Sequence, residues 1–209
     1  MFRVYFSDRN NAGYLLAHAW RKPPVGRIVV CGLARGGVIV ASPLAKSLHA
    51  PLFPVSVKKI GHPGNPEYAV AAVTPDGFMF ENQVETSQIS REWLHNQRKL
   101  ALAEISRREK LYQTDKSVLL NASLIVIVDD GVATGLTLLA AVRYIRSFSP
   151  EKIFVAVPVA PADFIDRLSK LVDKVICLEK AVVFSGSVGS YYASFPQVTD
   201  ARVISALSS

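Results

Sequence analysis

The sequence has little cysteine, fewer acidic than basic residues, and no long uninterrupted apolar run. Its two cysteines, Cys31 and Cys177, lie in apolar strand-like runs. We therefore expect buried, reduced thiols and neither a disulfide framework nor a metal site made of cysteines alone. No stretch is apolar and long enough to span a bilayer, and the first residues hold no apolar segment of signal-peptide length. These absences favour a cytoplasmic location and no membrane partner.

Charge is the most informative part of the composition. Lysine and arginine total 24 against 17 acidic residues, which gives a formal net charge of +7. Such a balance attracts nucleic acid, an anionic membrane surface or a phosphorylated small molecule, and it also suits a surface that serves solubility alone. Composition does not choose among these alternatives. A hydrophobic content of 50% does exclude global disorder.

Short apolar runs alternate with amphipathic stretches along most of the chain. Strands are predicted at 27–32, 51–57, 124–128, 153–157 and 174–178, and helices at 36–48, from the turn after 131 to 148, at 163–171 and at 200–207, the last one capped by Thr199. The strand runs are continuous rather than alternating, as a parallel sheet buried on both faces requires. The pattern predicts an α/β fold of three layers with a mainly parallel sheet.

The middle of the chain departs from this alternation. Strand-like pieces occur at 67–80 around a turn at 75–77, and a long polar helix is predicted at 87–113. This helix carries much of the positive charge, on Arg91, Arg98, Lys99, Arg107, Arg108 and Lys110. We expect one domain over 1–209, with a core at 26–60 and 118–180, an insertion at 61–117 and a C-terminal segment at 181–209 that forms a hood over a site. The inserted helix is a hood, a dimer contact or a solvated helix.

The strongest motif follows the predicted strand 124–128. Asp129 and Asp130 end this strand, and a turn between Gly131 and Gly135 opens the next helix. Ligands of open α/β sheets bind at the carboxyl ends of strands, and a Gly- and Thr-rich turn at a helix start presents N–H and hydroxyl groups to an anion. The adjacent carboxylates can accept hydrogen bonds from a diol or approach a cation. The loop therefore indicates a sugar phosphate, with a metal-binding acidic pair or an unliganded helix cap as alternatives.

This motif resembles the 5-phosphoribosyl 1-pyrophosphate (PRPP) motif of type I phosphoribosyltransferases. It is neither a Walker A loop nor the dinucleotide fingerprint, because the glycine spacing differs. The resemblance implies that Asp129 and Asp130 contact the ribose 3′- and 2′-hydroxyls. The turn that would hold the 5′-phosphate consists of Gly131, Val132, Ala133, Thr134, Gly135 and Thr137. Gly131 replaces a branched apolar residue usual in the family. Ala133 replaces an Asp of the hypoxanthine-guanine enzymes, which argues against their kind of 6-oxopurine acceptor.

A glycine turn after the first predicted strand is the second motif. The residues from Gly32 to Gly37 form a common type of strand-to-helix turn, which is weak evidence by itself. Their position resembles the pyrophosphate loop of the same family, in which a cis peptide is frequent. The resemblance implies a pyrophosphate site at Ala34, Arg35, Gly36 and Gly37.

Two lysines and a Gly/Pro-rich segment form the third motif, from Val57 to Tyr68. It resembles the family's Arg-Lys pair and mobile loop, with Lys58 in the place of the arginine. Lysine suits a diphosphate as a point charge, and such a loop can close over a site. Either His62 or Glu67 could serve as acid or base, or be plain surface residues. The resemblance gives catalytic roles to Lys58, Lys59, Arg35 and Glu67.

A last motif, 186–195, is rich in glycine and aromatic residues. Tyr191, Tyr192 or Phe195 could stack on a flat acceptor or pack in the core. A group of bacterial phosphoribosyltransferases shares this segment and the three motifs above. The resemblance implies transfer of the phosphoribosyl group from Mg-PRPP to a nitrogen acceptor such as a nucleobase, with Mg²⁺ held mainly by PRPP and no protein metal ligand. It also implies a homodimer. The alternative is a PRPP-sensing regulator or a nucleic-acid-binding protein on the same fold.

Overall fold

A parallel sheet of five strands lies at the centre of the computed structural model, which describes residues 5–20, 26–184 and 186–208. The strand order is β2-β1-β6-β7-β8. The strands span Leu52–Val55 (β2), Ile28–Leu33 (β1), Leu124–Val128 (β6), Lys152–Pro161 (β7) and Lys174–Ala181 (β8). The predicted mainly parallel sheet is confirmed.

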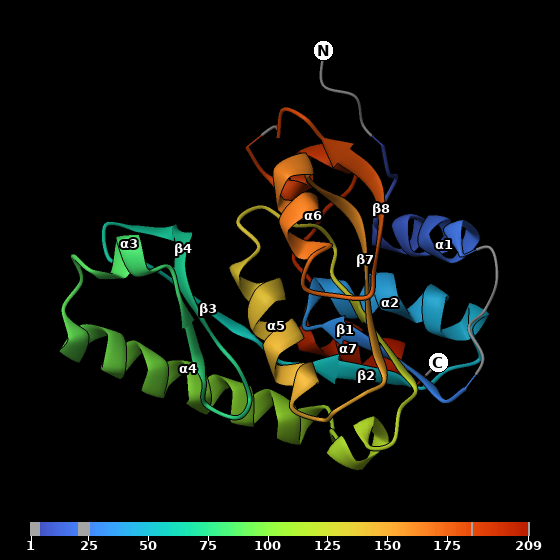
Figure 1. Ribbon diagram of the computed structural model, residues 1–209, viewed down its shortest axis with the longest axis horizontal. Coiled ribbons are helices and arrows are strands. Elements are labelled where there is room, and N and C mark those ends of the chain that lie inside the picture. The colour runs from blue at the N-terminus through green and yellow to red at the C-terminus, as the bar shows by residue number, and fades with distance from the viewer. Residues whose placement is uncertain (1–4, 21–25, 185, 209) are drawn as a thin grey trace.

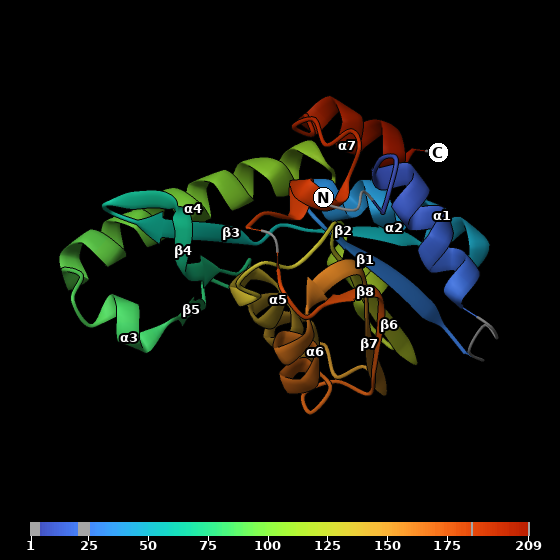
Figure 2. The same cartoon turned by 90° about the horizontal axis from the view of Figure 1, so that it is seen from above.

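Helices cover both faces of this sheet, as Figures 1 and 2 show. On one side lie α1 (Arg9–Ala19) and α2 (Gly36–Ser47), with α7 (Asp200–Leu207) packed on α2. On the other side lie α5 (Leu136–Arg146) and α6 (Ala162–Leu168). The three-layer α/β fold is therefore confirmed.

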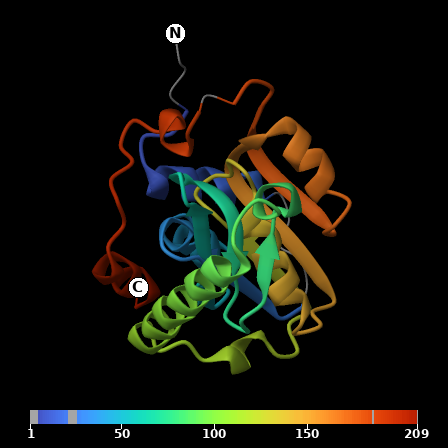
Figure 3. The same cartoon turned by 90° about the vertical axis from the view of Figure 1, so that its left-hand side faces the viewer.

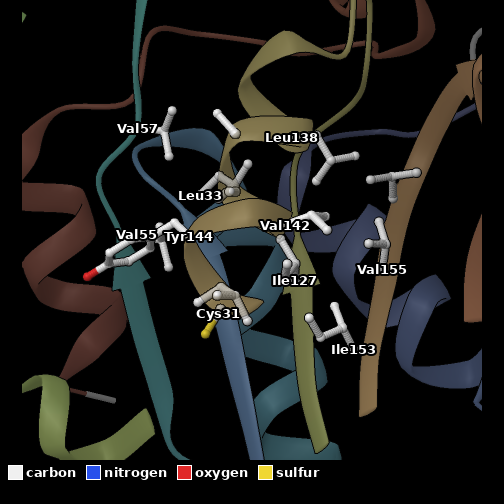
Figure 4. Packing of buried hydrophobic residues seen from close by; sticks show 14 of the residues in the cluster. Cys31, Leu33, Val55, Val57, Ile127, Leu138, Val142, Tyr144, Ile153 and Val155 are labelled. Atoms are coloured by element: carbon white, nitrogen blue, oxygen red, sulfur yellow. The ribbon is translucent and has the colours of Figure 1, made fainter. Parts of the chain in front are cut away.

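The two faces explain why the strand runs are continuously apolar. Ile125 and Ile127 of β6 belong to the core cluster under α5, which Figure 4 shows from close by. Their neighbours Val126 and Val128 belong to the cluster under α1 and α2. A strand covered on both faces needs an apolar side chain at every position.

A second, antiparallel sheet and its helices form a lobe beside the core (Figure 1). We call residues 58–111 the lobe. It contains β3 (Lys58–His62), β4 (Asn65–Val73), β5 (Met79–Glu81), α3 (Gln83–Thr86) and α4 (Arg91–Leu111). The partial apolar stripe of α4, with Leu94, Ala101 and Ile105, is buried on Ile60 and Val70 of the small sheet.

The lobe corrects two sequence expectations. The strand predicted at 51–57 stops at Val55, and Lys58 and Lys59 begin a separate strand, β3. The Gly/Pro-rich segment is a hairpin whose two strands are joined by residues 63–64, not an irregular loop. Gly61 lies at a register shift of this hairpin, where an added Cβ would stand 2.0 Å from the Pro66 carbonyl oxygen. The glycine therefore permits close strand pairing.

Other boundaries moved by a few residues. The long helix begins at Arg91 rather than near 87, because the Ser90 side chain accepts a hydrogen bond from the Trp93 N–H and caps it. The helix α1 was not predicted at all; Asp8 caps it by accepting from the Asn11 N–H at 2.8 Å. The predicted cap of α7 by Thr199 is confirmed.

Two 3₁₀ turns complete the described chain, Lys116–Leu119 and Val188–Tyr191. Both cysteines are free thiols; Cys31 is buried as expected, but Cys177 is only half-buried. Burial raises the pKa of the Cys177 thiol to about 11. No helix within the described ranges is long and apolar enough to cross a membrane.

Candidate active site

The paired carboxylates lie at the carboxyl end of β6, in the middle of the central sheet. Asp129 and Asp130 follow Val128 directly, and the Asp130 N–H donates to Asp129 Oδ1 at 2.9 Å. β6 lies between β1 and β7 in the sheet, so the loops that follow β1 and β7 lie on either side of the acidic pair. This placement follows from the parallel topology, in which carboxyl ends share one edge.

A cavity of about 290 Å³ opens beside the acidic pair. Its lining contains every residue of the predicted 5′-phosphate turn together with Lys59. The residues that line it are Lys59, Ala69, Asp129, Asp130, Gly131, Val132, Ala133, Thr134, Gly135, Thr137, Leu138 and Val188. Gly135 begins α5 with a φ of 80° and no side-chain cap. The first N–H groups of α5 therefore lack helical acceptors at the cavity wall.

The second predicted loop lies against the same carboxylates. A Cβ on Gly36 would stand 1.9 Å from Asp130 Oδ2, and one on Gly37 would stand 2.9 Å from Asp129 Cα. Glycine is thus required at both positions for the loop to approach the acidic pair. The peptide between Ala34 and Arg35 is cis, in agreement with the resemblance.

The two lysines of β3 have different surroundings. Lys59 lines the cavity, whereas Lys58 is half-buried beside basic groups. Burial lowers the pKa of Lys58, and the charges of Arg108 and Arg35 lower it further, against an opposing effect of Glu104. Arg108 is itself buried and pairs with Glu104 at 2.8 Å. Positive groups of the lobe, Lys58 and Arg108, therefore lie near Arg35 of the glycine loop.

The candidate acids or bases of the hairpin are His62 and Glu67. His62 Nδ1 accepts a hydrogen bond from the Gly64 N–H at 3.0 Å, a contact within the turn. Glu67 belongs to β4, but its side chain lies outside the described part of the structure. Its role as an acid or base stays a prediction.

The acidic pair is electrostatically unfavourable without a counter-ion. Burial and the Asp130 charge raise the pKa of Asp129 well above its usual range. Burial also raises the pKa of Asp130, and the Arg9 guanidinium opposes that rise. Arg9 Nε donates to Asp130 Oδ2 at 2.7 Å. The sequence analysis missed Arg9; the only local clue was Asp8 as a helix cap, and a contact across 121 positions leaves no spacing pattern.

The C-terminal segment contacts the acidic pair and the residue that follows it. Tyr191 and Tyr192 are each 5% exposed and pack in a cluster with Phe6, so packing rather than an open stacking surface accounts for them. The Tyr192 hydroxyl donates to the Asp130 backbone carbonyl at 2.6 Å. Val188 lies so close to Gly131 that a Cβ there would stand 2.4 Å from Val188 Cγ1. Glycine in place of a branched residue at 131 thus leaves space for the Val188 side chain.

The α/β core presents two carboxylates, a glycine- and threonine-rich turn and a glycine loop at one edge of its sheet, which is the arrangement expected of a phosphoribosyltransferase. Comparison with known proteins agrees with this class. The family model described as the phosphoribosyl transferase domain matches residues 9–193. The chain belongs to the phosphoribosyl transferase family.

Two curated relatives and one solved structure cover nearly all of the chain. The relatives, each named "Putative phosphoribosyl transferase", come from the Mycobacterium tuberculosis strains CDC 1551 / Oshkosh and H37Rv. Each is 36% identical over 205 residues, 97% of this chain and 46% of the relative. The chain thus spans about half the length of these relatives. The crystal structure of TT1426 from Thermus thermophilus has 35% identity, a TM-score of 0.76 and 98% coverage of both chains.

Proposed function

We propose that this protein transfers the 5-phosphoribosyl group of Mg-PRPP to a nitrogen acceptor, such as a nucleobase or related heterocycle, and releases pyrophosphate. In this reaction the bond from ribose C1 to the pyrophosphate oxygen breaks and a C1–N bond forms. Pyrophosphate leaves with the electron pair, and the acceptor nitrogen loses a proton. Family membership supports the reaction type.

One observation carries the proposal: three predicted substrate loops meet around one carboxylate pair. The glycine loop touches Asp129 and Asp130, and the turn 131–137 and Lys59 line the adjoining cavity. Each loop suits a different part of PRPP. The carboxylates would accept from the ribose hydroxyls, and the turn would bind the 5′-phosphate.

The pyrophosphate end would lie toward the positive charges. Arg35, Gly36 and Gly37 would bind pyrophosphate through backbone N–H groups, whereas Ala34 would contribute only to the shape of the loop, because its N–H donates to the Val55 carbonyl at 2.9 Å. Lys58, Lys59 and Arg35 would neutralise the charge that develops on the leaving group. Positioning and charge compensation are the main contributions expected of the protein in such a reaction.

Magnesium fits this site as part of the substrate. Among the described residues, no group of three or more His, Cys, Asp or Glu could hold a metal ion. Mg²⁺ usually keeps several waters and binds substrate phosphates. It would therefore enter on the oxygens of PRPP.

Location and assembly belong to the same proposal. Free thiols at Cys31 and Cys177 suit a reducing cytoplasm. A homodimer is the assembly that the family resemblance implies. Light scattering of the purified chain measures its mass directly.

The alternative of a nucleic-acid-binding protein rested on the basic helix α4. Four of its arginines have intramolecular acceptors in the structure. Arg91 pairs with Glu81, Arg107 and Arg108 pair with Glu104, and Arg98 donates to the Gly77 carbonyl. These contacts occupy guanidinium donors that a nucleic-acid phosphate would need, so the transferase remains the proposal.

The reaction is tested by pyrophosphate release. Wild-type protein, Mg-PRPP and a panel of nucleobases and related heterocycles are mixed, and pyrophosphate is measured against a blank without acceptor. The double variant Asp129→Asn, Asp130→Asn should keep the fold by circular dichroism and lose the release. Equal release by the wild type and the double variant would refute the assigned site.

A further inference from the structure

One arginine outside the matched loops joins three distant parts of the chain at the acidic pair. Arg9 Nε donates to Asp130 Oδ2 at 2.7 Å, and its Nη1 donates to the Pro196 carbonyl at 2.7 Å. Its Cζ lies 3.6 Å from the centre of the Phe195 ring. Arg9 belongs to the first turn of α1, which packs on α2 behind the sheet (Figure 2).

These contacts fix the Arg9 side chain on several sides. The side chain is 10% exposed, and the aromatic ring and backbone carbonyl determine where its guanidinium lies. A planar guanidinium with two directed hydrogen bonds loses little freedom on binding a further partner. Asp130 therefore meets a cation that is already in place.

Asp130 is held from other directions as well. The Tyr192 hydroxyl donates to its backbone carbonyl, and its own N–H donates to Asp129 Oδ1. Gly36 allows Oδ2 to lie against the glycine loop, where a Cβ would stand 1.9 Å away. Arg9 is the contact that acts on the carboxylate itself through an opposite charge.

We propose that Arg9 is the positioning residue of the ribose site, which holds the Asp130 carboxylate ionised and in one orientation so that it accepts a hydroxyl of the bound sugar. The proposal rests on the proposed function, because the hydroxyl belongs to PRPP. It adds a residue that lies 121 positions from Asp130 along the chain.

The charged surroundings of Asp130 give the proposal a pH signature. The titratable groups that face it are Arg9 from α1, Asp129 from its own loop and Tyr192 from the C-terminal segment, with Asp8 next to Arg9. Burial disfavours the ionised form of Asp130, and the charge and hydrogen bond of Arg9 favour it, helped by the hydrogen bond with Asp129. Without Arg9 the pKa of Asp130 rises further, so hydroxyl binding should improve as pH increases and the carboxyl loses its proton.

The test is calorimetric binding of Mg-PRPP to wild type, Arg9→Met and Arg9→Lys at several pH values between 6 and 8. We expect Arg9→Met to raise the dissociation constant about tenfold at pH 6, since a hydrogen bond to a charged group is involved, and less at pH 8. Arg9→Lys should restore most of the affinity and most of the pH profile of the wild type. The matched control is Arg202→Met, which removes an exposed arginine near Arg9 that has no contact with Asp130.

A second measurement tests the charge effect without ligand. The carboxyl ¹³C resonance of Asp130 is followed against pH in the wild type, in Arg9→Lys and in Arg9→Met. If Arg9→Met does not fold, the comparison of the wild type with Arg9→Lys, which keeps a cation at this position, still gives a result. We expect Asp130 to titrate lowest in the wild type. Identical Asp130 titrations and identical Mg-PRPP affinities across the variants would overturn the proposal. Failure of the wild type to bind Mg-PRPP would overturn the proposed function and with it the ribose role of Asp130. In that case the NMR titration would still show whether Arg9 keeps the Asp130 carboxylate ionised.

Discussion

The core and the lobe are stabilised in different ways. The core sheet is apolar on both faces, and Val126, Ile127 and their neighbours are fully buried. The lobe has a smaller cluster of its own under α4. It joins the core through small apolar residues such as Ala72, which pack in the cluster under α5, and through polar contacts such as the ion pair of Arg143 with Asp76. At its other end, shown in Figure 3, Arg107 and Tyr112 both bind Asp200 of α7, at 2.7 and 2.6 Å.

This difference suggests that the core and the lobe contribute differently to the site. The core fixes the acidic pair and the phosphate turn, which need exact placement, on rigid strands. The lobe contributes Lys58 and Lys59 from the strand nearest the junction. Contacts between charged, partly exposed groups are weaker than a packed core, so the lobe is the part in which local opening should require less free energy.

The largest expected effect is a cavity in the core. Ile127→Ala should destabilise the protein by about 4 kcal/mol, because Ile127 is fully buried between layers that cannot easily close the gap. The matched lobe variant, Ile105→Ala, should cost about 2 kcal/mol, because the single α4 can settle toward the small sheet. Urea unfolding measures both. Equal losses would contradict the distinction between core and lobe.

The next effect concerns the phosphate turn. Gly135→Ala places a Cβ 1.9 Å from the Phe164 ring at a φ of 80°, so we expect a loss of about 3 kcal/mol from clash and backbone strain together. Gly186 is the control: its φ is 73°, but no atom lies within 4 Å of the added Cβ. Gly186→Ala should cost only about 1 kcal/mol. Thermal melts of the two variants separate strain from clash.

The junction between lobe and core should weaken in acid. Hydrogen bonds from Arg107 and Arg108 lower the pKa of Glu104 from 4.5 to about 2. A lowered carboxyl pKa contributes stability above pH 4.5, and this contribution is lost as pH falls toward 2. The protection factors of the α4 amides, which are corrected for the intrinsic pH dependence of exchange, should fall over this range in the wild type. Glu104→Gln should show faster exchange at pH 7 and a smaller change with acid; an unchanged acid response would exclude Glu104 as its source.

The smallest effect is expected at the outer end of the lobe. Arg91 pairs with Glu81 at 2.7 Å, but its side chain is 71% exposed. Arg91→Met should change stability by less than about 0.5 kcal/mol, because solvent screens such pairs. A larger loss in urea unfolding would mean that surface ion pairs hold the lobe more firmly than the comparison suggests.

The sequence predicted the parts of the molecule that follow local rules. The run from Leu124 to Val128, the acidic pair and the glycine turn determine strand, site and helix within one short segment. The helix α1 escaped prediction, because its apolar residues form no clear stripe and Gly13 replaces a side chain where α1 meets α2; a Cβ there would stand 2.4 Å from the Val40 carbonyl oxygen. The role of Arg9 depends on tertiary packing, which spacing along the chain does not encode.

The glycines and prolines of 61–66 led to the opposite kind of error. They are expected to form a loop, whereas in the structure they belong to a hairpin in which Gly61 allows the strands to approach closely. The same composition suits both structures, since glycine serves wherever a side chain would obstruct the backbone. Strand pairing across the hairpin decides between them.

The most direct test of the account is a calorimetric titration of the wild-type protein with Mg-PRPP, with ribose 5-phosphate as the comparison ligand. The proposed site predicts Mg²⁺-dependent binding of PRPP that is clearly tighter than binding of ribose 5-phosphate, because only PRPP reaches the glycine loop and the lysines. Equal affinities for PRPP and ribose 5-phosphate would be consistent with a 5′-phosphate site at the turn 131–137 and would contradict the pyrophosphate site. If neither ligand binds, the assignment of the acidic pair to the ribose hydroxyls is contradicted.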